Sequence, residues 1–262
     1  MSTFRILLAD DHPIFRFGLS SLLESHEQWE VCGEAADGRA AAEKCKQLKP
    51  DLLILDICLP ILNGLDTARQ ILKHNPAQAI LILTAVDSEQ VIRDCLEAGV
   101  RGWVFKSDGT TDLTTAVEAI QRRKSIFSAR VSNLITDGYK RHRVDPGAAR
   151  MPKLSPRERE VVQLVSEGKA SKEVAAILNV TLATAETHRS NIMRKLELHS
   201  IAELVLYAVR NEIVHVHSAS VLRFPAPPVE QSRPRATADY EALPEAVNAR
   251  RDVGRRSFTE DR

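Results

Sequence analysis

The sequence has few of the features that mark metal-thiolate, disulfide-bonded or membrane proteins. Its four cysteines all lie within the first 95 residues and show no Cys-x-x-Cys or Cys/His ligand spacing, so we expect free thiols. No signal peptide and no apolar run of membrane-spanning length is visible, which predicts a cytoplasmic protein without a membrane partner. The turn after the first apolar run reads Asp10-Asp11-His12-Pro13. It lacks a glycine-rich fingerprint, and its carboxylates would repel a dinucleotide pyrophosphate.

Charge is distributed unevenly along the 262 residues. Residues 1–124 hold 14 Lys/Arg and 18 Asp/Glu, residues 125–152 hold 5 and 2, and residues 153–216 hold 9 and 8. An acidic first half, a basic connector and a balanced second half indicate two domains with different tasks. Beyond residue 216 the chain is rich in Pro and Arg and has little periodicity, which predicts a disordered tail over 217–262.

Short apolar runs alternate with helical patterns over residues 1–124. The runs cover 4–9, 30–36, 52–55, 79–83 and 102–105. Five βα units with short connections predict an α/β, flavodoxin-like (βα)5 fold, with a parallel sheet in the order 2-1-3-4-5 and helices on both faces. In such sheets the ligand site lies at the carboxyl ends of the strands.

Polar side chains follow the predicted strands at that edge. Asp10 and Asp11 follow the first strand, Asp56 the third, Thr84 the fourth and Lys106 the fifth. Alone, Asp56 is equally well explained as the cap of a turn. Because the first and third strands are neighbours, however, the three carboxylates would lie together and need a counter-charge. Mg²⁺ and Lys106 would supply it, and Asp56 is then placed to act as a nucleophile toward a phosphoryl group, with Thr84 donating to the phosphoryl oxygens.

This set of residues resembles a response-regulator receiver domain. The matching residues are Asp10-Asp11, Asp56, Pro60, Asn63-Gly64, Thr84-Ala85 and Gly99 to Lys106. The resemblance implies that a sensor histidine kinase phosphorylates Asp56. It also implies that Mg²⁺ is bound by Asp11, Asp56 and the backbone carbonyl of Cys58, with Asp10 assisting, and that Lys106 contacts the phosphoryl group.

The resemblance further implies that Thr84 and Trp103 form a coupled switch pair. The family usually has Tyr or Phe where this chain has Trp103, so the size and exposure of the switch side chain stay open. A receiver that keeps the fold without phosphorylation is one alternative, which the complete set of key positions disfavours. A hydrolase of the haloacid-dehalogenase kind is another alternative. Enzymes of that class carry an Asp-x-Asp motif with a second Asp two residues after the nucleophile, whereas this chain has Cys58 at that position. We therefore expect no enzyme.

Residues 154–212 carry helical patterns separated by clear start and stop signals. The pattern predicts helices over 155–168, 171–178, 182–196 and 200–212, the first opened by a capping box of Ser155 and Glu158. Two short helices joined by a tight turn, the second polar on one side, predict a separate all-α, four-helix helix-turn-helix domain. Between the domains, residues 127–143 have helical character, and 145–152 is turn-rich and predicts a hinge.

The second domain resembles the LuxR-type DNA-binding domain of NarL/FixJ regulators. The matching strings are Leu154 to Glu160, Gly168, Ser171 to Ala175, Thr184, Thr187-His188, Asn191-Ile192 and Lys195-Leu196. The resemblance implies that residues 182–197 enter the major groove of double-stranded DNA. The predicted base-facing residues are Glu186, Thr187 and Ser190, and the predicted phosphate contacts are Lys172, Arg189, Arg194 and Lys195. The net charge of +1 over residues 153–216 predicts modest affinity of a single domain for DNA and reliance on homodimers. Helix 200–212 is the expected dimer face, with the alternative that Ile201 and Leu204 belong to the core.

We therefore predict a two-component response regulator. Its expected parts are a receiver over 1–124, a linker helix and hinge over 125–152, a LuxR-type helix-turn-helix domain over 153–216, and the tail. Phosphorylation of Asp56 would control sequence-specific DNA binding and transcription. The alternative is a phosphoryl sink or interaction adaptor that does not read DNA, which a failure to bind random duplex at low salt would favour.

Overall fold

The computed structural model describes residues 3–127, 131–132 and 154–215. A parallel sheet forms the centre of the first domain, with its strands in the order β2-β1-β3-β4-β5-β6. The strands are β1 (Phe4–Ala9), β2 (Trp29–Ala35), β3 (Leu52–Leu55), β4 (Ala79–Thr84), β5 (Gly102–Phe105) and β6 (Ile126–Phe127). The predicted order of the first five strands is confirmed, and β3 and β4 are buried along their whole length.

The sixth strand is a departure from the prediction. Phe127, which we expected to begin the linker helix, instead pairs with Trp103, and Ile126 pairs with Gly102. These two apolar residues cover the open edge of β5, which suits a strand better than an exposed helix start. Val131 and Ser132 are helical as predicted. Residues 128–130 and 133–152 of the predicted linker and hinge, and the whole predicted tail over 217–262, lie outside the described residues.

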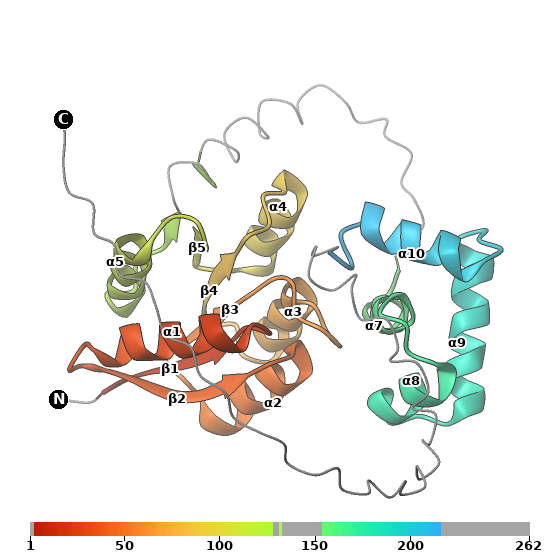
Figure 1. The fold of residues 1–262 in the computed structure, drawn as a ribbon, viewed down its shortest axis with the longest axis horizontal. Coiled ribbons are helices and arrows are strands. Elements are labelled where there is room, and N and C mark those ends of the chain that lie inside the picture. The colour runs from red at the N-terminus through yellow and green to blue at the C-terminus, as the bar shows by residue number, and fades with distance from the viewer. Residues whose placement is uncertain (1–2, 128–130, 133–153, 216–262) are drawn as a thin grey trace, which may run out of the picture. The chain divides into compact units, whose positions relative to one another are not determined.

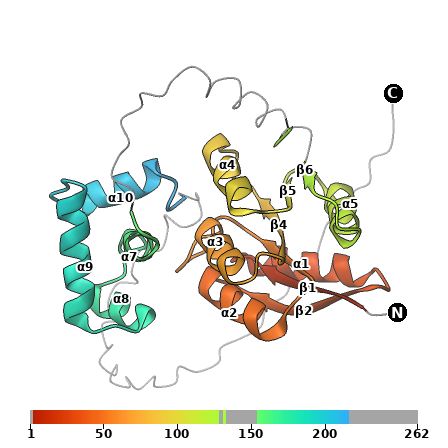
Figure 2. The ribbon, with the colours of Figure 1, turned by 180° about the vertical axis from the view of Figure 1, so that it is seen from behind.

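Helices cover both faces of the sheet (Figures 1 and 2). On one face α1 (Pro13–Glu24) and α5 (Thr110–Gln121) pack against one apolar cluster, and on the other face α2 (Gly38–Leu48), α3 (Gly64–His74) and α4 (Glu89–Ala98) pack against a second. The side chains of Asn63 and Ser88 cap α3 and α4 by accepting backbone N–H groups, and Gly99 ends α4 at a φ of 99°. The boundaries read from the sequence thus have local chemical causes.

The second domain is a group of four described helices, coloured green to blue in Figure 1. They are α7 (Pro156–Ser166), α8 (Ser171–Leu178), α9 (Leu182–Lys195) and α10 (Ile201–Arg210). The capping box of Ser155 and Glu158 is confirmed. The second helix begins at Ser171 as predicted, and Ala170 holds the cap position and donates its N–H to Glu173. Within the described residues no helix is long and apolar enough to cross a bilayer.

One glycine fixes the distance between α3 and the end of β3. A Cβ on Gly64 would lie 2.1 Å from the carbonyl oxygen of Asp56, a contact that requires the backbone to move. We expect Gly64→Ala to lower the free energy of unfolding by roughly 1–3 kcal/mol, as overpacking does elsewhere, measured by urea denaturation.

The matched control is Gly18→Ala in the exposed part of α1. Among the described residues nothing lies within 4 Å of a Cβ built there, and alanine is the better helix former by about 1 kcal/mol. Gly18→Ala should therefore stabilise the protein. Equal losses in both variants would contradict the proposed close approach.

Candidate functional site

A partly buried ammonium group joins two buried carboxylates at the carboxyl ends of the strands. The Nζ of Lys106 lies 2.7 Å from Oδ2 of Asp56 and 2.7 Å from Oδ2 of Asp10. Only 2% of the Asp56 side chain and 4% of the Asp10 side chain are exposed. The convergence predicted from the strand ends is therefore present, and both acids share one counter-charge.

The surroundings of Lys106 favour its charged form. Its ammonium also lies 4.8 Å from the centre of the Phe15 ring on α1, within cation–π distance. Burial lowers the pKa of Lys106, but attraction and hydrogen bonding by Asp56 and Asp10 outweigh it, so that the pKa is raised. The lysine is thus held as a cation in the site at neutral pH.

The acids of the site fit a hard divalent cation. Asp10, Asp11, His12 and Asp56 each offer a ligand atom within 4.8 Å of the others. Among the described residues, Oδ1 of Asp56 is buried and has no hydrogen-bond partner, which leaves a carboxylate oxygen for a ligand. Carboxylate oxygens are the donors that Mg²⁺ prefers. Sequence reasoning missed His12, although its position directly after Asp10-Asp11 was a signal.

The other predicted receiver residues lie around this cluster. Cys58 is half-buried, and burial together with the neighbouring Asp56 carboxylate raises the pKa of its thiol far above the ordinary value. Thr84 is fully buried, and its hydroxyl oxygen accepts the N–H of Val86. Trp103 is only 1% exposed and meets Phe105 edge to face. The question of its exposure is therefore answered: in this structure the indole is an interior group.

The residues predicted to contact DNA lie mostly on the surface. Glu186, Thr187, Ser190, Arg194, Lys195 and Lys172 are exposed and Arg189 is half-buried. The basic members differ in their pairing. Lys195 forms a 2.7 Å ion pair with Glu158, and Arg194 donates to the side-chain oxygen of Asn191 at 2.9 Å. The three predicted base-facing side chains are accessible without any rearrangement of α9.

Both domains match known families. Residues 6–118 match the response regulator receiver domain, and residues 152–208 match the bacterial regulatory proteins of the luxR family. The chain belongs to the response regulators. It is similar to the response regulator protein VraR of Staphylococcus aureus, with 32% identity over 81% of this chain and 99% of the relative.

Solved structures of response regulators are also similar. The RcsB response regulator of Salmonella typhimurium has 30% identity and a TM-score of 0.51 over 80% of this chain and 100% of that one. A LuxR-family regulator from Aurantimonas sp. has 34% identity and a TM-score of 0.51 over 53% of this chain and 99% of that one. A complex of RcsB with DNA has 30% identity and a TM-score of 0.50 over 79% of this chain and 98% of that one.

In this response regulator the loop between β3 and α3 contacts α7 through buried polar groups. The side-chain oxygen of Gln163 accepts the backbone N–H of Asn63 at 2.8 Å, and its amide nitrogen donates to the carbonyl of Leu59 at 3.0 Å. Both oxygens of Glu167 accept the backbone N–H of Ile61, at 3.1 and 3.2 Å. Sequence reasoning missed these contacts, although a glutamine within the apolar run Val161 to Val165 was a signal of a specific partner.

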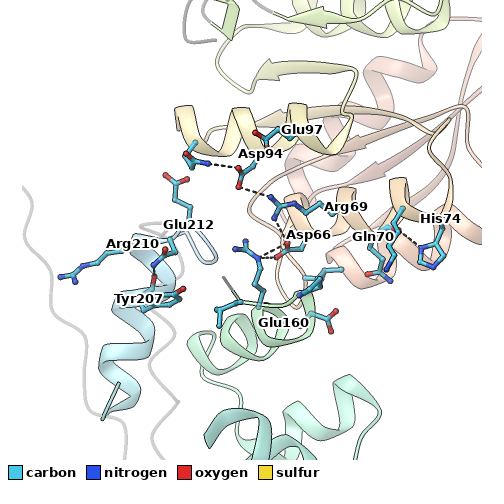
Figure 3. A pocket seen from close by; sticks show the side chains of 17 residues that line it. Asp66, Arg69, Gln70, His74, Asp94, Glu97, Glu160, Tyr207, Arg210 and Glu212 are labelled. Carbon is cyan, nitrogen blue, oxygen red and sulfur yellow. Dashed lines mark hydrogen bonds and ion pairs between the residues drawn. The ribbon is translucent and has the colours of Figure 1, made fainter. Parts of the chain in front are cut away.

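A cleft of about 780 Å³ lies away from Asp56 and is lined by parts of α3, α4, α7 and α10. Figure 3 shows that its central charges are already paired. Arg69 bridges Asp66 and Asp94 at 3.2 Å each, and Arg159 contacts Asp66 at 2.9 Å. The centre of this cleft thus consists of paired charges, whereas the carboxylate cluster has a buried oxygen of Asp56 without a hydrogen-bond partner among the described residues.

The shared counter-charge leads to a prediction for Asp10→Asn. Two carboxylates face one ammonium, so removing one negative charge relieves like-charge repulsion while Asp56 keeps its partner. In EDTA we expect the free energy of unfolding to rise by about 1 kcal/mol, equivalent to somewhat less than one unit of pKa shift. The added stability given by MgCl₂ should fall, because an ion stabilises only as far as it binds.

Urea denaturation with EDTA and with MgCl₂ measures both effects. Glu27→Gln, which removes an exposed acid, is the control and should leave both values unchanged. A destabilised Asp10→Asn variant in EDTA would show that the Asp10–Lys106 attraction exceeds the repulsion between the acids.

Proposed function

We propose that Asp56 accepts a phosphoryl group from a sensor histidine kinase and that this modification controls DNA binding and transcription. The observation that carries the proposal is the geometry at Asp56. One of its oxygens is held by Lys106, and the other is buried without a hydrogen-bond partner among the described residues. A buried carboxylate in this arrangement has an oxygen left for attack and a cation beside it.

The chemistry assigns a role to each neighbouring side chain. An oxygen of Asp56 attacks the phosphorus of a phosphohistidine, the P–N bond breaks, and an acyl phosphate forms. Lys106 then holds a phosphoryl oxygen, and the hydroxyl of Thr84 turns to donate to another. Asp11, Asp56 and the carbonyl of Cys58 would hold Mg²⁺, with Asp10 assisting, and the bound ion would neutralise charge on the phosphoryl oxygens.

The second domain supports DNA as the target. The complex of RcsB with DNA shows a relative on duplex DNA, and this chain exposes Glu186, Thr187 and Ser190 on α9 for base contacts. Phosphate contacts would come from Lys172, Arg189 and Arg194, and from Lys195 once it leaves Glu158. We propose that a homodimer forms on DNA through α10, which exposes the apolar side chains of Ile201 and Leu206.

The loop after Asp56 would connect phosphorylation of the receiver with DNA binding by the helical domain. The segment from Leu59 to Asn63 begins three residues after Asp56. It is held by Gln163 of α7 and by Glu167, the C-cap residue of that helix. A phosphoryl group and an ion at Asp56 would shift this loop and weaken its contacts with α7. The helical domain is then released to pair with a second copy on DNA.

Acetyl phosphate tests the phosphorylation proposal. With MgCl₂ it should phosphorylate the wild type and raise its affinity for an operator selected from random DNA by about tenfold, a coupling of about 1.4 kcal/mol. Fluorescence anisotropy measures the affinity and phosphate-affinity electrophoresis the modification. Asp56→Asn, which keeps the side-chain volume, should show neither effect, and equal affinity of the wild type with and without acetyl phosphate would refute the coupling.

A pair of substitutions on α7 tests the connection through the loop. Gln163→Met keeps the side-chain volume but removes both hydrogen-bonding groups of the amide. As long as the loop stays against α7, the N–H of Asn63 and the carbonyl of Leu59 then lack a partner, whereas water can satisfy them once the contact opens. It should therefore weaken the contact and raise DNA affinity without acetyl phosphate. Small-angle scattering should show a larger radius of gyration, whereas Gln47→Met on the exposed face of α2 should change neither quantity.

We expect Glu167→Gln to strengthen the contact between the loop and α7, and so to lower the DNA affinity measured without acetyl phosphate, opposite to the effect of Gln163→Met. Burial raises the pKa of Glu167, against the lowering effect of its hydrogen bonds with Gln163 and Ile61. The buried, ionised carboxylate therefore weakens the contact between the loop and α7. Glu167 stabilises this contact most at low pH, where the acid is protonated, and this stabilisation is lost as the pH rises through the raised pKa. An amide keeps an acceptor for the N–H of Ile61 and carries no charge. A Glu167→Gln variant that binds DNA more tightly than wild type would contradict this account.

A further inference from the structure

The outward face of α9 offers few groups that can read a base pair. Ala185 and Ile192 are buried against the core of the helical domain. The exposed residues over 182–190 are Leu182, Ala183, Glu186, Thr187 and Ser190. They include no Arg, Lys, Asn or Gln, the side chains that bind guanine or adenine through paired hydrogen bonds. Because the N-terminal part of the second helix of a helix-turn-helix contacts base edges, recognition falls to a carboxylate, two hydroxyls and apolar groups.

Glu186 is the charged member of this exposed set, and no contact within the described residues accounts for it. Its carboxylate makes no hydrogen bond or ion pair with any of them. Other acids of the domain have such a use: Glu158 pairs with Lys195, and Glu173 accepts a backbone N–H at the start of α8. A carboxylate on the surface that approaches the phosphates of DNA weakens the attraction between them. A donor on a base would compensate for that loss.

The major groove offers such a donor without a competing acceptor on one base. Cytosine presents its N4 amino group there, adenine presents an amino group beside the acceptor N7, and guanine and thymine present only acceptors as polar groups. We propose that Glu186 accepts a hydrogen bond from the N4 amino group of a cytosine, so that this regulator selects operators with a cytosine at one fixed position of each half-site. This assignment rests on the DNA-binding function proposed above and adds the base that is read.

The neighbours of Glu186 on α9 discriminate less between bases. The hydroxyl of Thr187 donates to the carbonyl of Ala183 at 2.8 Å, so its proton is already used within the helix. Its methyl group remains for an apolar contact, such as one with the methyl group of thymine. Ser190 has a hydroxyl that can either donate or accept. The strongest hydrogen-bonding preference on this part of the surface therefore belongs to Glu186.

The carboxylate also acts against the wrong base. Opposite guanine or thymine it would lose water and face an acceptor, which leaves a buried charge without a partner. The helical domain carries a net charge of only +1 over residues 153–216, so its attraction to phosphates compensates little for such a loss. Glu186 therefore gives specificity by repulsion from other sequences as well as by attraction to cytosine.

Selection of binding sites from random DNA tests the assignment with the full-length chain, acetyl phosphate and MgCl₂. The motif enriched by the wild type should contain a fixed cytosine in each half-site. Glu186→Gln should abolish the preference for cytosine at that position alone and favour adenine, because an amide side chain binds N6 and N7 of adenine. The matched control is Glu197→Gln, which removes an exposed acid just beyond α9 and should leave the motif unchanged.

Fluorescence anisotropy then measures the coupling between the side chain and the base. Replacing the C·G pair by T·A should weaken binding of the wild type about tenfold for each half-site, a typical loss for one mismatched pair. Glu186→Ala should bind the two operators within about twofold of each other, since it has no carboxylate to distinguish them. It should bind random duplex at least as tightly as the wild type, which also shows that the variant is folded.

The outcomes separate this assignment from the proposed function. A motif without a fixed cytosine, or a preference for cytosine that persists in Glu186→Gln, would overturn the assignment and leave sequence-specific DNA binding intact. If the wild type enriches no sequence at all, the proposed reading of DNA fails, and the assignment fails with it.

Discussion

The ammonium of Lys106 is the interaction on which the site depends. It lies 2.7 Å from carboxylates of both Asp10 and Asp56, which come from different strands and are almost fully buried. Two such acids would repel one another strongly without a cation. Because β1, β3 and β5 end at the same edge of a parallel sheet, a short stretch of backbone at each end suffices to assemble all three groups.

The same edge carries the loop that leads away from Asp56, and this loop contains a strained residue. Ile61 has a φ of 69°, a rare conformation for a β-branched side chain. Its N–H is held by Glu167, and its side chain packs against the apolar cluster of the helical domain. Strain of this kind persists only where its surroundings compensate it. The loop conformation therefore depends on contacts with the helical domain as well as on the carboxylate cluster at Asp56.

Much of this architecture could be predicted from sequence because its causes are local. Unbroken apolar runs predict the buried strands, and strand ends in a parallel sheet place Asp10, Asp56 and Lys106 together. The pairing of Gln163 with Asn63 could not be predicted, since it joins residues 100 positions apart and no local pattern specifies the partner. The strand at Phe127 escaped prediction for a similar reason: the free edge of β5, not its own periodicity, makes it a strand.

Trp103 illustrates how a buried residue can still be poised to move. The indole is almost fully buried, and the inward position is favoured because it removes a large apolar surface from water. Its Nε1, however, has no hydrogen-bond partner among the described residues, a cost of about 1–3 kcal/mol. An outward rotamer would give the N–H to water and expose the ring. Each position thus has a gain that the other lacks. We propose that the Thr84 hydroxyl, once drawn toward a phosphoryl group at Asp56, changes the space beside β4 and shifts this balance.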